Sequence, residues 1–567
     1  MASIQKRLIH GRPYYYLVES RRVQGKPRPV VLKYLGRAED LLSRLHAAET
    51  TAHPIAAQVR DCGAVVALWD LAQQLQLIGI IDAHVPKRHQ GPTVGEYLIL
   101  AAINRCVAPT SKRAFAQWYT ATSLPRLCKL SPNQLTSQRF WDHMTAVGET
   151  AIEKIEADIS ARLRSQFDID VRCLCFDCTN FDTFIETPNP ARLPQRGHAK
   201  SKRRDLRVVG LALMVSTDFH VPLFSQIYPG NQHDAVTFAS VTHQLVERYR
   251  RLAQEATHIT LVFDKGNNSQ DNLQALADSP YHVIGSLVPS QHPELLAIPL
   301  SRFEGLANPR LEGVVAYRTR AEVFGREWTV VVTRSDTLLE AQLRGIAQQL
   351  RTRRQSLATL QQKIRRSQAT GARGKGYTRE SLEKHLTHLQ SGQYMRDILS
   401  ITVHASHERL TLTYRTNQRA FEDLIQTRLG KRILFTDNHD WSTEEIILGY
   451  RSQHHVEAAF RQMKDPHFVS WKPLYHWTDQ KIRVHAFYCV LALILSSLLH
   501  RQVVASGMAL SLERILTELS AIQEIVNLYP SPSPKGGRPR STTLLTRLTP
   551  VQEQLSRTLG LDRYRPI

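Results

Sequence analysis

Two short runs in the middle of the chain, VRCLCFD (171–177) and HITLVFD (258–264), decide the fold. Each is mostly apolar and ends in an aspartate, which predicts a buried strand with a carboxylate at its carboxyl end. Burying a carboxylate without a partner is costly, so an aspartate in this position either caps the following turn or serves a site. Asp177 and Asp264 therefore mark both a sheet and a candidate site.

Five strand-like runs follow one another between residues 171 and 288, and a helical stretch at about 234–253 separates the third run from the fourth. This order predicts an α/β fold with a mixed sheet of ribonuclease-H type. In such a sheet the first and fourth strands lie side by side, so Asp177 and Asp264 are expected at neighbouring positions. Two adjacent carboxylates repel each other unless a cation lies between them, and ligation by oxygen alone suits Mg²⁺.

A third carboxylate is expected from a helix that packs against this sheet, and residues 443–464 have a helical pattern. Tyr450, Glu457 and Lys464 are spaced by seven residues, so they share one helix face to within about 20° per step. Arg461, four residues beyond Glu457, lies on the same side. Such a row of polar side chains does not pack in a core. It therefore belongs either to a functional site or to an exposed helix face with a Glu–Arg pair.

The chain carries 73 Lys and Arg residues against 51 Asp and Glu residues, a formal net charge of +22. Its 42% apolar and 22% charged residues exclude a disordered or collagen-like chain. This excess of positive charge indicates a polyanionic partner, nucleic acid before an anionic membrane, although a basic surface also aids solubility. Residues 192–207 have seven Lys and Arg against one Asp, and residues 341–380 have ten against one Glu.

The seven cysteines and the N-terminal sequence, which lacks the apolar stretch of a signal peptide, predict reduced thiols in a cytoplasmic protein. Cys173, Cys175 and Cys178 do not have the spacing of a zinc site. The longest uncharged run, 484–500, is shorter than a membrane span, which predicts a buried helix and no membrane partner.

Asp177 within FDCTNFDTF, Asp264 within VFDKGNNS and the Tyr450–Glu457–Lys464 spacing resemble the DDE transposases of bacterial insertion sequences. The group meant has a Tyr-Arg-Glu-Lys signature around its catalytic glutamate and a large insertion between the second aspartate and that glutamate. The motifs GHAK (197–200) and YPGN (228–231) support the resemblance, which covers nearly the whole chain. One position departs from the signature, because Gln453 stands in place of its arginine.

The resemblance implies a transposase that cleaves DNA at the terminal inverted repeats of its element and joins those ends to target DNA. It implies that Asp177, Asp264 and Glu457 are catalytic and hold two Mg²⁺ ions, for which Mn²⁺ can substitute. A homodimer in a synaptic complex and association with the bacterial nucleoid are expected. The expected DNA contacts are Tyr450, Lys464, Arg461, His198, Lys200, Lys202, Arg203, Arg204 and Arg207.

Two alternatives remain open from the residues alone. One is a ribonuclease-H-like nuclease or resolvase that cuts DNA without strand transfer, because hydrolysis and joining use the same carboxylates and metals. The other is a non-catalytic DNA-binding protein derived from a transposase.

The patterns divide the chain into six expected segments, the first of which is a hairpin predicted from β-rich runs at 13–19 and 28–34. The segments are an N-terminal β-hairpin (1–37), a helical DNA-binding or dimerisation region (38–168), the first part of the catalytic core (169–290), an inserted α+β module (291–435), the C-terminal part of the core with the Glu helix (436–500), and a basic helical tail with a Pro/Gly linker (501–567).

Overall fold

The computed structural model describes most of the chain, in two compact units. The described residues are 2–23, 26–50, 53–85, 91–186, 189–197, 199–232, 236–237, 259–264, 270–277, 281–369, 377–406, 409–530 and 540–566. The terminal unit comprises Met1–Ala146, Pro466–Pro473 and Leu495–Ile567, and the central unit comprises Val147–Asp465 and Leu474–Ile494.

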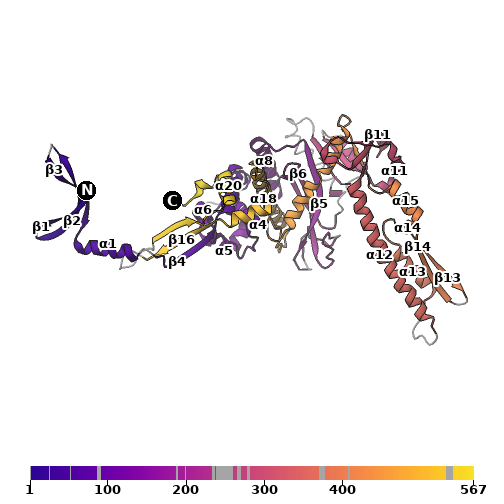
Figure 1. The fold of residues 1–567 in the computed structure, drawn as a ribbon, viewed down its shortest axis with the longest axis horizontal. Coiled ribbons are helices and arrows are strands. Elements are labelled where there is room, and N and C mark those ends of the chain that lie inside the picture. Colours follow the sequence, from indigo (N-terminus) through magenta and orange to yellow (C-terminus); the bar gives the residue numbers. More distant parts are fainter. Residues whose placement is uncertain are drawn as a thin grey trace. The chain divides into compact units, whose positions relative to one another are not determined.

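The terminal unit begins with a three-stranded antiparallel sheet, the N-terminal sheet, in which β2 lies between β1 and β3 (Figure 1). Its strands are β1 (Ala2–Ile9), β2 (Arg12–Val23) and β3 (Lys26–Gly36), and the helix α1 (Ala38–Thr50) follows. The predicted hairpin is present as β2 and β3. β1 escapes prediction because ASIQKRLI lacks the regular apolar–polar alternation of a half-buried strand.

Closely packed helices form the core of the terminal unit. They are α2 (Gly63–Gln74), α3 (Leu77–His84), α4 (Val94–Val107), α5 (Phe115–Thr120), α6 (Leu124–Cys128), α7 (Ser137–Thr145), α19 (Leu512–Ser520) and α20 (Pro550–Thr558), with 3₁₀ turns η1 (Pro132–Gln134) and η6 (Leu561–Tyr564). α2 approaches α19 so closely that a Cβ at Gly63 would overlap the carbonyl oxygen of Leu519. α4 begins at a capping box in which Thr93 and Glu96 each accept the other's amide hydrogen.

Strands from distant parts of the sequence pair in a second three-stranded sheet of the terminal unit. β16 (Gln523–Tyr529) lies between β4 (Ala56–Asp61) and β17 (Arg540–Leu545) and is antiparallel to both. Buried Glu524 on β16 accepts a hydrogen bond from Arg126 at 2.9 Å, and buried Asp70 on α2 accepts one from Tyr564 at 2.6 Å. These contacts fold the C-terminal segment together with the N-terminal helices.

The helix α18 (Asp479–Ala505) contributes residues up to Ile494 to the central unit and the rest to the terminal unit. Within the described part of the chain, α18 alone is long and apolar enough to cross a membrane as a single helix, with a mean hydropathy of 1.9 over its most apolar 18 residues. α2 and α3 would qualify only as one bent span. Because 94% of the α18 window is buried inside the protein, the predicted buried helix at 484–500 is confirmed.

A nine-stranded mixed sheet organises the central unit, in the order β10-β11-β12-β15-β9-β8-β5-β6-β7 (Figure 1). Its strands are β5 (Cys173–Thr183), β6 (Arg207–Ser216), β7 (Pro222–Pro229), β8 (Ile259–Val262), β9 (Tyr281–Ser286), β10 (Glu304–Gly305), β11 (Val314–Val323), β12 (Arg326–Ser335) and β15 (Lys431–Thr436). β5, β6 and β7 are antiparallel neighbours, whereas β8 is parallel to both β5 and β9. The prediction that the first and fourth strands lie side by side is therefore confirmed.

Helices of the central unit lie between and beside these strands. They are α8 (Glu149–Phe167), α10 (Gln270–Ala277), α11 (Pro293–Leu296), α12 (Asp336–Ser367), α13 (Arg379–Leu389), α14 (Met395–Ile398), α15 (Gln418–Thr427), α16 (Thr443–Arg451) and α17 (His454–Lys464), with 3₁₀ turns η3 (Pro289–Gln291), η4 (Leu300–Arg302) and η5 (Pro309–Leu311). The helix predicted at 234–253 lies outside the described residues except for 236–237.

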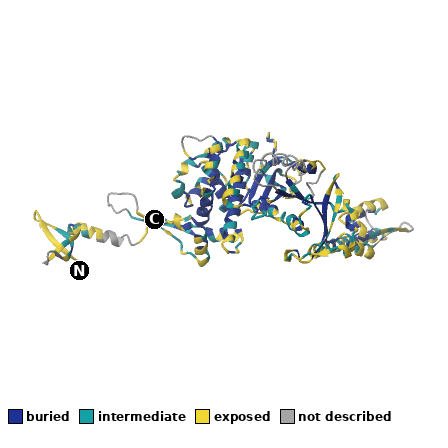
Figure 2. Ribbon diagram, turned by 90° about the horizontal axis from the view of Figure 1, so that it is seen from above, coloured by how far each residue is buried: buried dark blue, intermediate teal, exposed yellow. Residues whose placement is uncertain are grey.

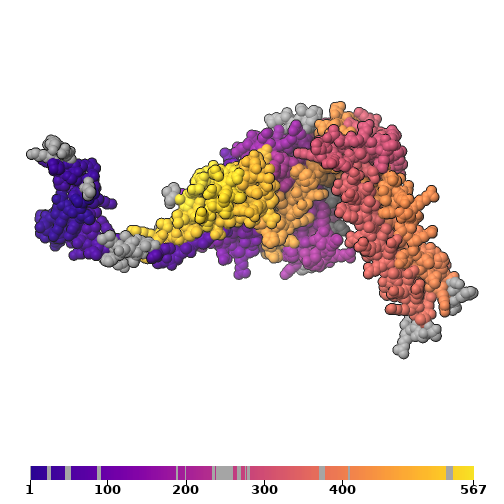
Figure 3. All heavy atoms as spheres, in the orientation of Figure 1, coloured from indigo at the N-terminus to yellow at the C-terminus, as the bar shows by residue number. Residues whose placement is uncertain are grey.

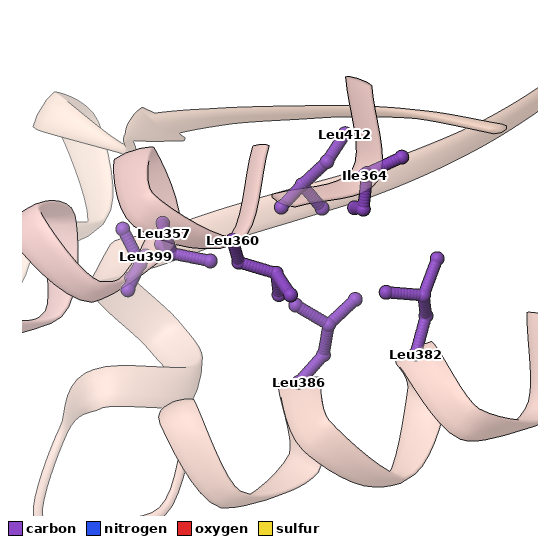
Figure 4. Close-up of a cluster of buried hydrophobic side chains, with 7 residues drawn as sticks. All are labelled: Leu357, Leu360, Ile364, Leu382, Leu386, Leu399 and Leu412. Atoms are coloured by element: carbon purple, nitrogen blue, oxygen red, sulfur yellow. The ribbon is translucent and has the colours of Figure 1, made fainter. Parts of the chain in front are cut away.

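The segment 291–435 contributes both to the central sheet and to a separate small core. β12 pairs with β11 and β15, and β15 pairs with β9, so these strands extend the sheet. Between β12 and β15, α12 packs beside the hairpin of β13 (Leu399–Ser406) and β14 (Arg409–Thr416) (Figure 3). The buried side chains of this small core are Leu357, Leu360, Ile364, Leu382, Leu386, Leu399 and Leu412 (Figure 4).

Candidate active site

Asp177 lies on β5, on the face that also carries Cys175 and Thr179, because alternate residues of a strand point to the same side. Both neighbours contact the helices above the sheet. The Cys175 thiol donates to the carbonyl of Ser452 at 3.1 Å, and Lys464 Nζ donates to Thr179 Oγ1 at 2.7 Å. The half-buried side chain of Asp177 therefore faces the layer formed by α16 and α17.

Asp264 follows β8 and occupies the same register position as Asp177 on the neighbouring strand. Cys175 and Val262 are the last paired residues of the two parallel strands, and each aspartate comes two residues later. Adjacent strands lie about 4.8 Å apart, so the two aspartates project from neighbouring backbone positions. Asp177 Oδ1 also accepts the amide hydrogen of Cys178 at 2.7 Å.

Tyr450, near the end of α16, is buried, with 6% of its surface exposed. Its hydroxyl donates to Ser286 Oγ at 2.9 Å and contacts Asp264 Oδ1 at 3.5 Å, while the Arg432 guanidinium lies over its ring. Burial raises the pKa of the Tyr450 hydroxyl, which keeps it protonated as a donor. The Tyr450 ring packs inside the protein in this structure.

The continuous helix predicted over 443–464 is wrong, because the segment forms two helices that meet at a tight turn. At this turn, both the hydroxyl and the amide of Ser452 donate to the carbonyl of Gly449. Bonds that reach back three residues tighten a helix, and a serine hydroxyl competes for backbone acceptors. Tyr450 and Lys464 therefore do not share one face: Tyr450 reaches β9, whereas Lys464 reaches β5.

The contacts of α17 establish which way its two edges face. Its buried side consists of Val456, Ala459, Phe460 and Met463. On one edge, Gln462 bonds His220 in the turn after β6 at 2.8 Å, and on the opposite edge Lys464 reaches β5. Glu457 is exposed and lies only about 20° from Lys464 around the helix, so it belongs to the edge facing β5. Arg461 is exposed about 40° further round.

Two lysines lie beside the strand that carries Asp177. Burial and the charge of Lys200 lower the pKa of Lys464, against the opposing effect of Asp177. Lys200 Nζ donates to the carbonyl of Cys178, and its amide donates to Asn180 Oδ1 at 3.0 Å. The side chains of both lysines are thus held against β5.

The other cations of the segment 192–207 have different surroundings. Arg203 pairs with Asp205, which lowers the pKa of the Asp205 carboxyl to about 2. Arg207 donates at 3.3 Å to a backbone carbonyl of the same loop. His198 lies outside the described residues. The exposed cations of the loop include Lys202 and Arg204.

Three glycines let this loop lie directly on the sheet. A Cβ at Gly197 would overlap the carbonyl oxygen of Gly230, and a Cβ at Gly230 would overlap that of Val208. A Cβ at Gly210 would overlap the ring of Tyr228. The sequence motifs around Gly197 and Gly230 are therefore parts of one packed contact, which places the lysine three residues after Gly197 next to β5.

The donor set fits a divalent cation only in part. Carboxylate oxygens are the ligands that Mg²⁺ and Mn²⁺ prefer, and Asp177 and Asp264 supply them from adjacent strands. Throughout the described ranges, however, no three His, Cys, Asp or Glu side chains are grouped so that they could hold a metal ion. Glu457 therefore does not complete a ligand set with the two aspartates in this conformation.

A comparison with protein families finds a match over most of the central unit. Residues 182–495, more than half of the chain, match the transposase DDE domain. The chain belongs to the DDE transposase family. Residues 3–57 match the N-terminal domain of IS1634 family transposases. The resemblance to insertion-sequence transposases is thus confirmed, and the protein is a transposase, an enzyme that cleaves and transfers DNA.

Two solved structures resemble the transposase at low sequence identity. A cryo-EM structure of the piggyBac transposase synaptic complex with hairpin DNA gives a TM-score of 0.36 at 9% identity, covering 80% of this chain and 79% of that chain. The Mos1 transposase paired-end complex with the left transposon end gives 0.15 at 12% identity, covering 37% of this chain and 63% of that chain. A comparison with curated proteins gives no match.

Sequence reasoning missed Ser286, the partner of the Tyr450 hydroxyl. The signal was present, because Ser286 ends the apolar strand β9 as a polar residue, just as Asp264 follows the apolar strand β8. A polar residue at the end of a buried strand can therefore mark a supporting contact as well as a candidate catalytic residue.

Proposed function

We propose that the transposase performs its chemistry with Asp177, Asp264 and Glu457, carried by a ribonuclease-H-like core. The strand order β7-β6-β5-β8-β9, with three antiparallel strands followed by two parallel ones, supports this core. The observation that carries the proposal is the equivalent register of Asp177 and Asp264 on adjacent parallel strands, on the face of β5 that α17 covers.

The role of Glu457 is supported by its position on α17. Lys464 anchors one edge of the helix to β5, and Glu457 lies on that same edge with an exposed side chain. A shift of α17 about the Ser452 turn that brings the Glu457 carboxylate to the two aspartates would complete the set of three ligands. We expect binding of DNA and metal to favour this position, since a third carboxylate adds to the repulsion between the aspartates unless a cation lies among the three.

The expected cofactor is Mg²⁺, two ions per site, with Mn²⁺ as a substitute, held by oxygens of Asp177, Asp264 and Glu457. When bound, such ions activate a water or a DNA 3′-hydroxyl and stabilise the leaving oxygen during in-line attack on a phosphodiester. The protein orients the ligands: the Tyr450 hydroxyl steadies Asp264, and the Cys178 amide steadies Asp177.

The cations around β5 are suited to hold the DNA backbone during this reaction. Lys464 and Lys200 flank the strand of Asp177, where each ammonium can neutralise a phosphate. The exposed side chains of Arg461, Lys202 and Arg204 extend this surface. Arg203 and Arg207 already bond to protein groups, so their phosphate contacts would require those bonds to open.

Hydrolysis at the terminal inverted repeats frees the 3′ ends of the element, and the same site then joins them to target DNA. Two ends must be handled together, so we expect a homodimer in a synaptic complex.

Incubation of the full chain with element-end DNA, target plasmid and Mg²⁺ tests this proposal. Asp177→Asn and Asp264→Asn should each reduce cleavage and joining by at least ~100-fold while DNA binding is retained, because a neutral amide is a poor ligand for a divalent cation. Asp182→Asn is the matched control. Asp182 lies on the same strand but on its other face, where it accepts a hydrogen bond from Ser201 at 2.8 Å, so this variant should stay active.

Other outcomes would favour the alternatives. Cleavage without joined products indicates a nuclease or resolvase, and binding without cleavage by the unaltered protein indicates a DNA-binding derivative. Full activity of Asp177→Asn would refute the site assignment.

A further inference from the structure

We propose that the N-terminal sheet (residues 2–36) docks on duplex DNA through the phosphate backbone, on the face that carries its tyrosines. The inference goes beyond the site proposed above, because it assigns a DNA contact to a part of the chain in which no catalytic residue lies. It rests on three observations: the charge of the segment, the arrangement of its aromatic and basic side chains, and its exposure.

The charge of the segment is unbalanced. Residues 2–37 contain nine Lys and Arg residues and a single acidic residue, Glu19, which gives a net charge of +8. Glu19 is paired with Arg21 at 2.8 Å and offers its carboxylate to that neighbour. The remaining cations have no other carboxylate within the segment, and the two acidic residues that follow it, Glu39 and Asp40 on α1, offset only part of their charge near Arg37.

Three tyrosines of this sheet form a cluster with Arg7 of β1 and with Arg37, which directly follows β3. Tyr14, Tyr16 and Tyr34 lie together, with ring centroids 5.1 Å apart for Tyr16–Tyr34 and 6.1 Å apart for Tyr14–Tyr34. Arg7 lies 5.1 Å from the Tyr16 ring and Arg37 lies 5.6 Å from the Tyr14 ring. A guanidinium stacked on an aromatic ring is pre-oriented and keeps donors free for a phosphate.

Strand register defines two faces with similar charge. Arg7 pairs with Tyr14 and Arg12 with Ile9, so both arginines lie on the tyrosine face. Lys6 pairs with Tyr15 and Lys33 with Leu17, so both lysines lie on the opposite face. All four basic side chains are exposed: Arg7, Arg12, Lys6 and Lys33.

The sheet has almost no core of its own. Among its described side chains, Val18 is the buried hydrophobic one, with 4% exposed, whereas Ile4 is 63% exposed and Tyr34 is 51% exposed. Figure 2 shows the strands of this sheet largely in the colour of exposed residues. Three strands with so little buried apolar surface are marginal alone, which favours a surface that is completed by a partner.

Duplex DNA is the partner that this chemistry favours. A second copy of residues 2–37 would bring +8 against +8, which opposes association. An anionic membrane would match the charge, but residues 182–495 of the same chain match the DDE domain of transposases, which act on DNA, so DNA is the polyanion favoured here. Contacts from arginines and tyrosines to phosphates position DNA without reading its sequence, so the docking should be independent of base sequence.

The test compares two double variants of the full chain in DNA binding without Mg²⁺, at several NaCl concentrations. Arg7→Gln/Arg12→Gln changes the tyrosine face, and Lys6→Gln/Lys33→Gln removes the same charge from the opposite face of the same sheet. Loss of two phosphate contacts lowers the slope of log K against log[salt] by about 1.8 and the affinity at 0.2 M salt by roughly 20-fold. The DNA affinity of the opposite-face variant should fall by less than about threefold, because its removed charges act on the DNA only at long range.

Controls make each outcome decisive. Arg7→Lys/Arg12→Lys keeps the charge and should restore the slope, which separates a lost contact from a misfolded sheet. An unchanged slope in the tyrosine-face variant overturns the proposal, and equal losses in both double variants overturn the assignment to one face. If the tyrosine-face variant keeps its DNA affinity but no longer binds phosphatidylserine vesicles, the partner of this face is a membrane. If it keeps its DNA affinity but no longer sediments as a dimer, the partner is a second copy of the chain. Asp177→Asn should keep the unaltered slope, so failure of the catalytic proposal leaves this one standing.

Discussion

Replacing Tyr450 by phenylalanine distinguishes a DNA contact from a buried support for Asp264. The change removes one hydroxyl and leaves the ring packed under Arg432. It abolishes the 2.9 Å bond to Ser286 and the 3.5 Å contact with Asp264. Because Ser286 is buried, its hydroxyl loses a partner that water does not replace, at a cost of about 1–3 kcal/mol in the free energy of unfolding.

The effect on catalysis should be smaller, because the contact with Asp264 is long. Its loss costs about 1 kcal/mol at the carboxylate, which corresponds to roughly a fivefold slower single-turnover cleavage. We expect the Kd for element-end DNA to stay within about twofold and the melting temperature to fall by roughly 2–5 °C. In the double variant with Ser286→Ala, the destabilisation should be less than the sum of the single effects, since both changes remove the same bond.

Tyr475→Phe is the matched control, because Tyr475 belongs to the same unit and is exposed. It should leave both stability and cleavage unchanged. Weakened DNA binding by Tyr450→Phe with unchanged stability and cleavage at saturating DNA would refute the reasoning, since that is the behaviour of an exposed DNA contact.

Three further predictions concern other contacts. Burial and the charge of Lys200 lower the pKa of Lys464, so the cleavage rate should fall as the pH rises through that lowered pKa if cleavage needs the Lys464 ammonium. In Lys464→Arg, the pH–rate profile should fall only at higher pH, because a guanidinium stays charged. If the fall occurs at the same pH in this variant, it belongs to another group. Gly230→Ala should lower the free energy of unfolding by about 1–3 kcal/mol, measured by thermal melting, because the added Cβ overlaps a carbonyl oxygen. Gly305→Ala is the control and should be neutral, because a Cβ there meets no atom within 4 Å; equal melting temperatures of the two variants would contradict the packed contact. Glu524→Gln should lower the free energy of unfolding by about 2 kcal/mol, measured with denaturant. This is less than for a fully buried ion pair, because the Arg126 side chain is 30% exposed. An unchanged free energy of unfolding would show that the pair does not stabilise the fold.

The strands of the central sheet could be predicted because their signal is local. Runs such as 171–177 and 258–264 show their apolar character within a few residues, and the order of elements then places Asp177 beside Asp264. The turn at Ser452 could not be predicted, because a seven-residue spacing reports helical phase and contains no information about a hydroxyl that bonds the backbone.

Long-range pairing was equally invisible to local patterns. β15 lies far from β9 in the sequence, and only the folded chain shows that it joins the same sheet. The positive charge of the N-terminal sheet could be counted from the sequence. Which face each of the eight cations on its three strands occupies is known only from the register, which places Arg7 and Lys6 on opposite faces.

The pairing of β4 with β16 imposes an order on the making of this protein. A ribosome that adds about 5–20 residues per second needs roughly 20–90 s between the residues of β4 and those of β16. Every residue of the central unit precedes Leu495, so that unit can fold while translation continues. In the terminal unit, by contrast, the sheet of β4, β16 and β17 receives its middle strand, β16, near the end of synthesis. A nascent chain can therefore hold both aspartates in a finished sheet before the sheet of β4, β16 and β17 closes.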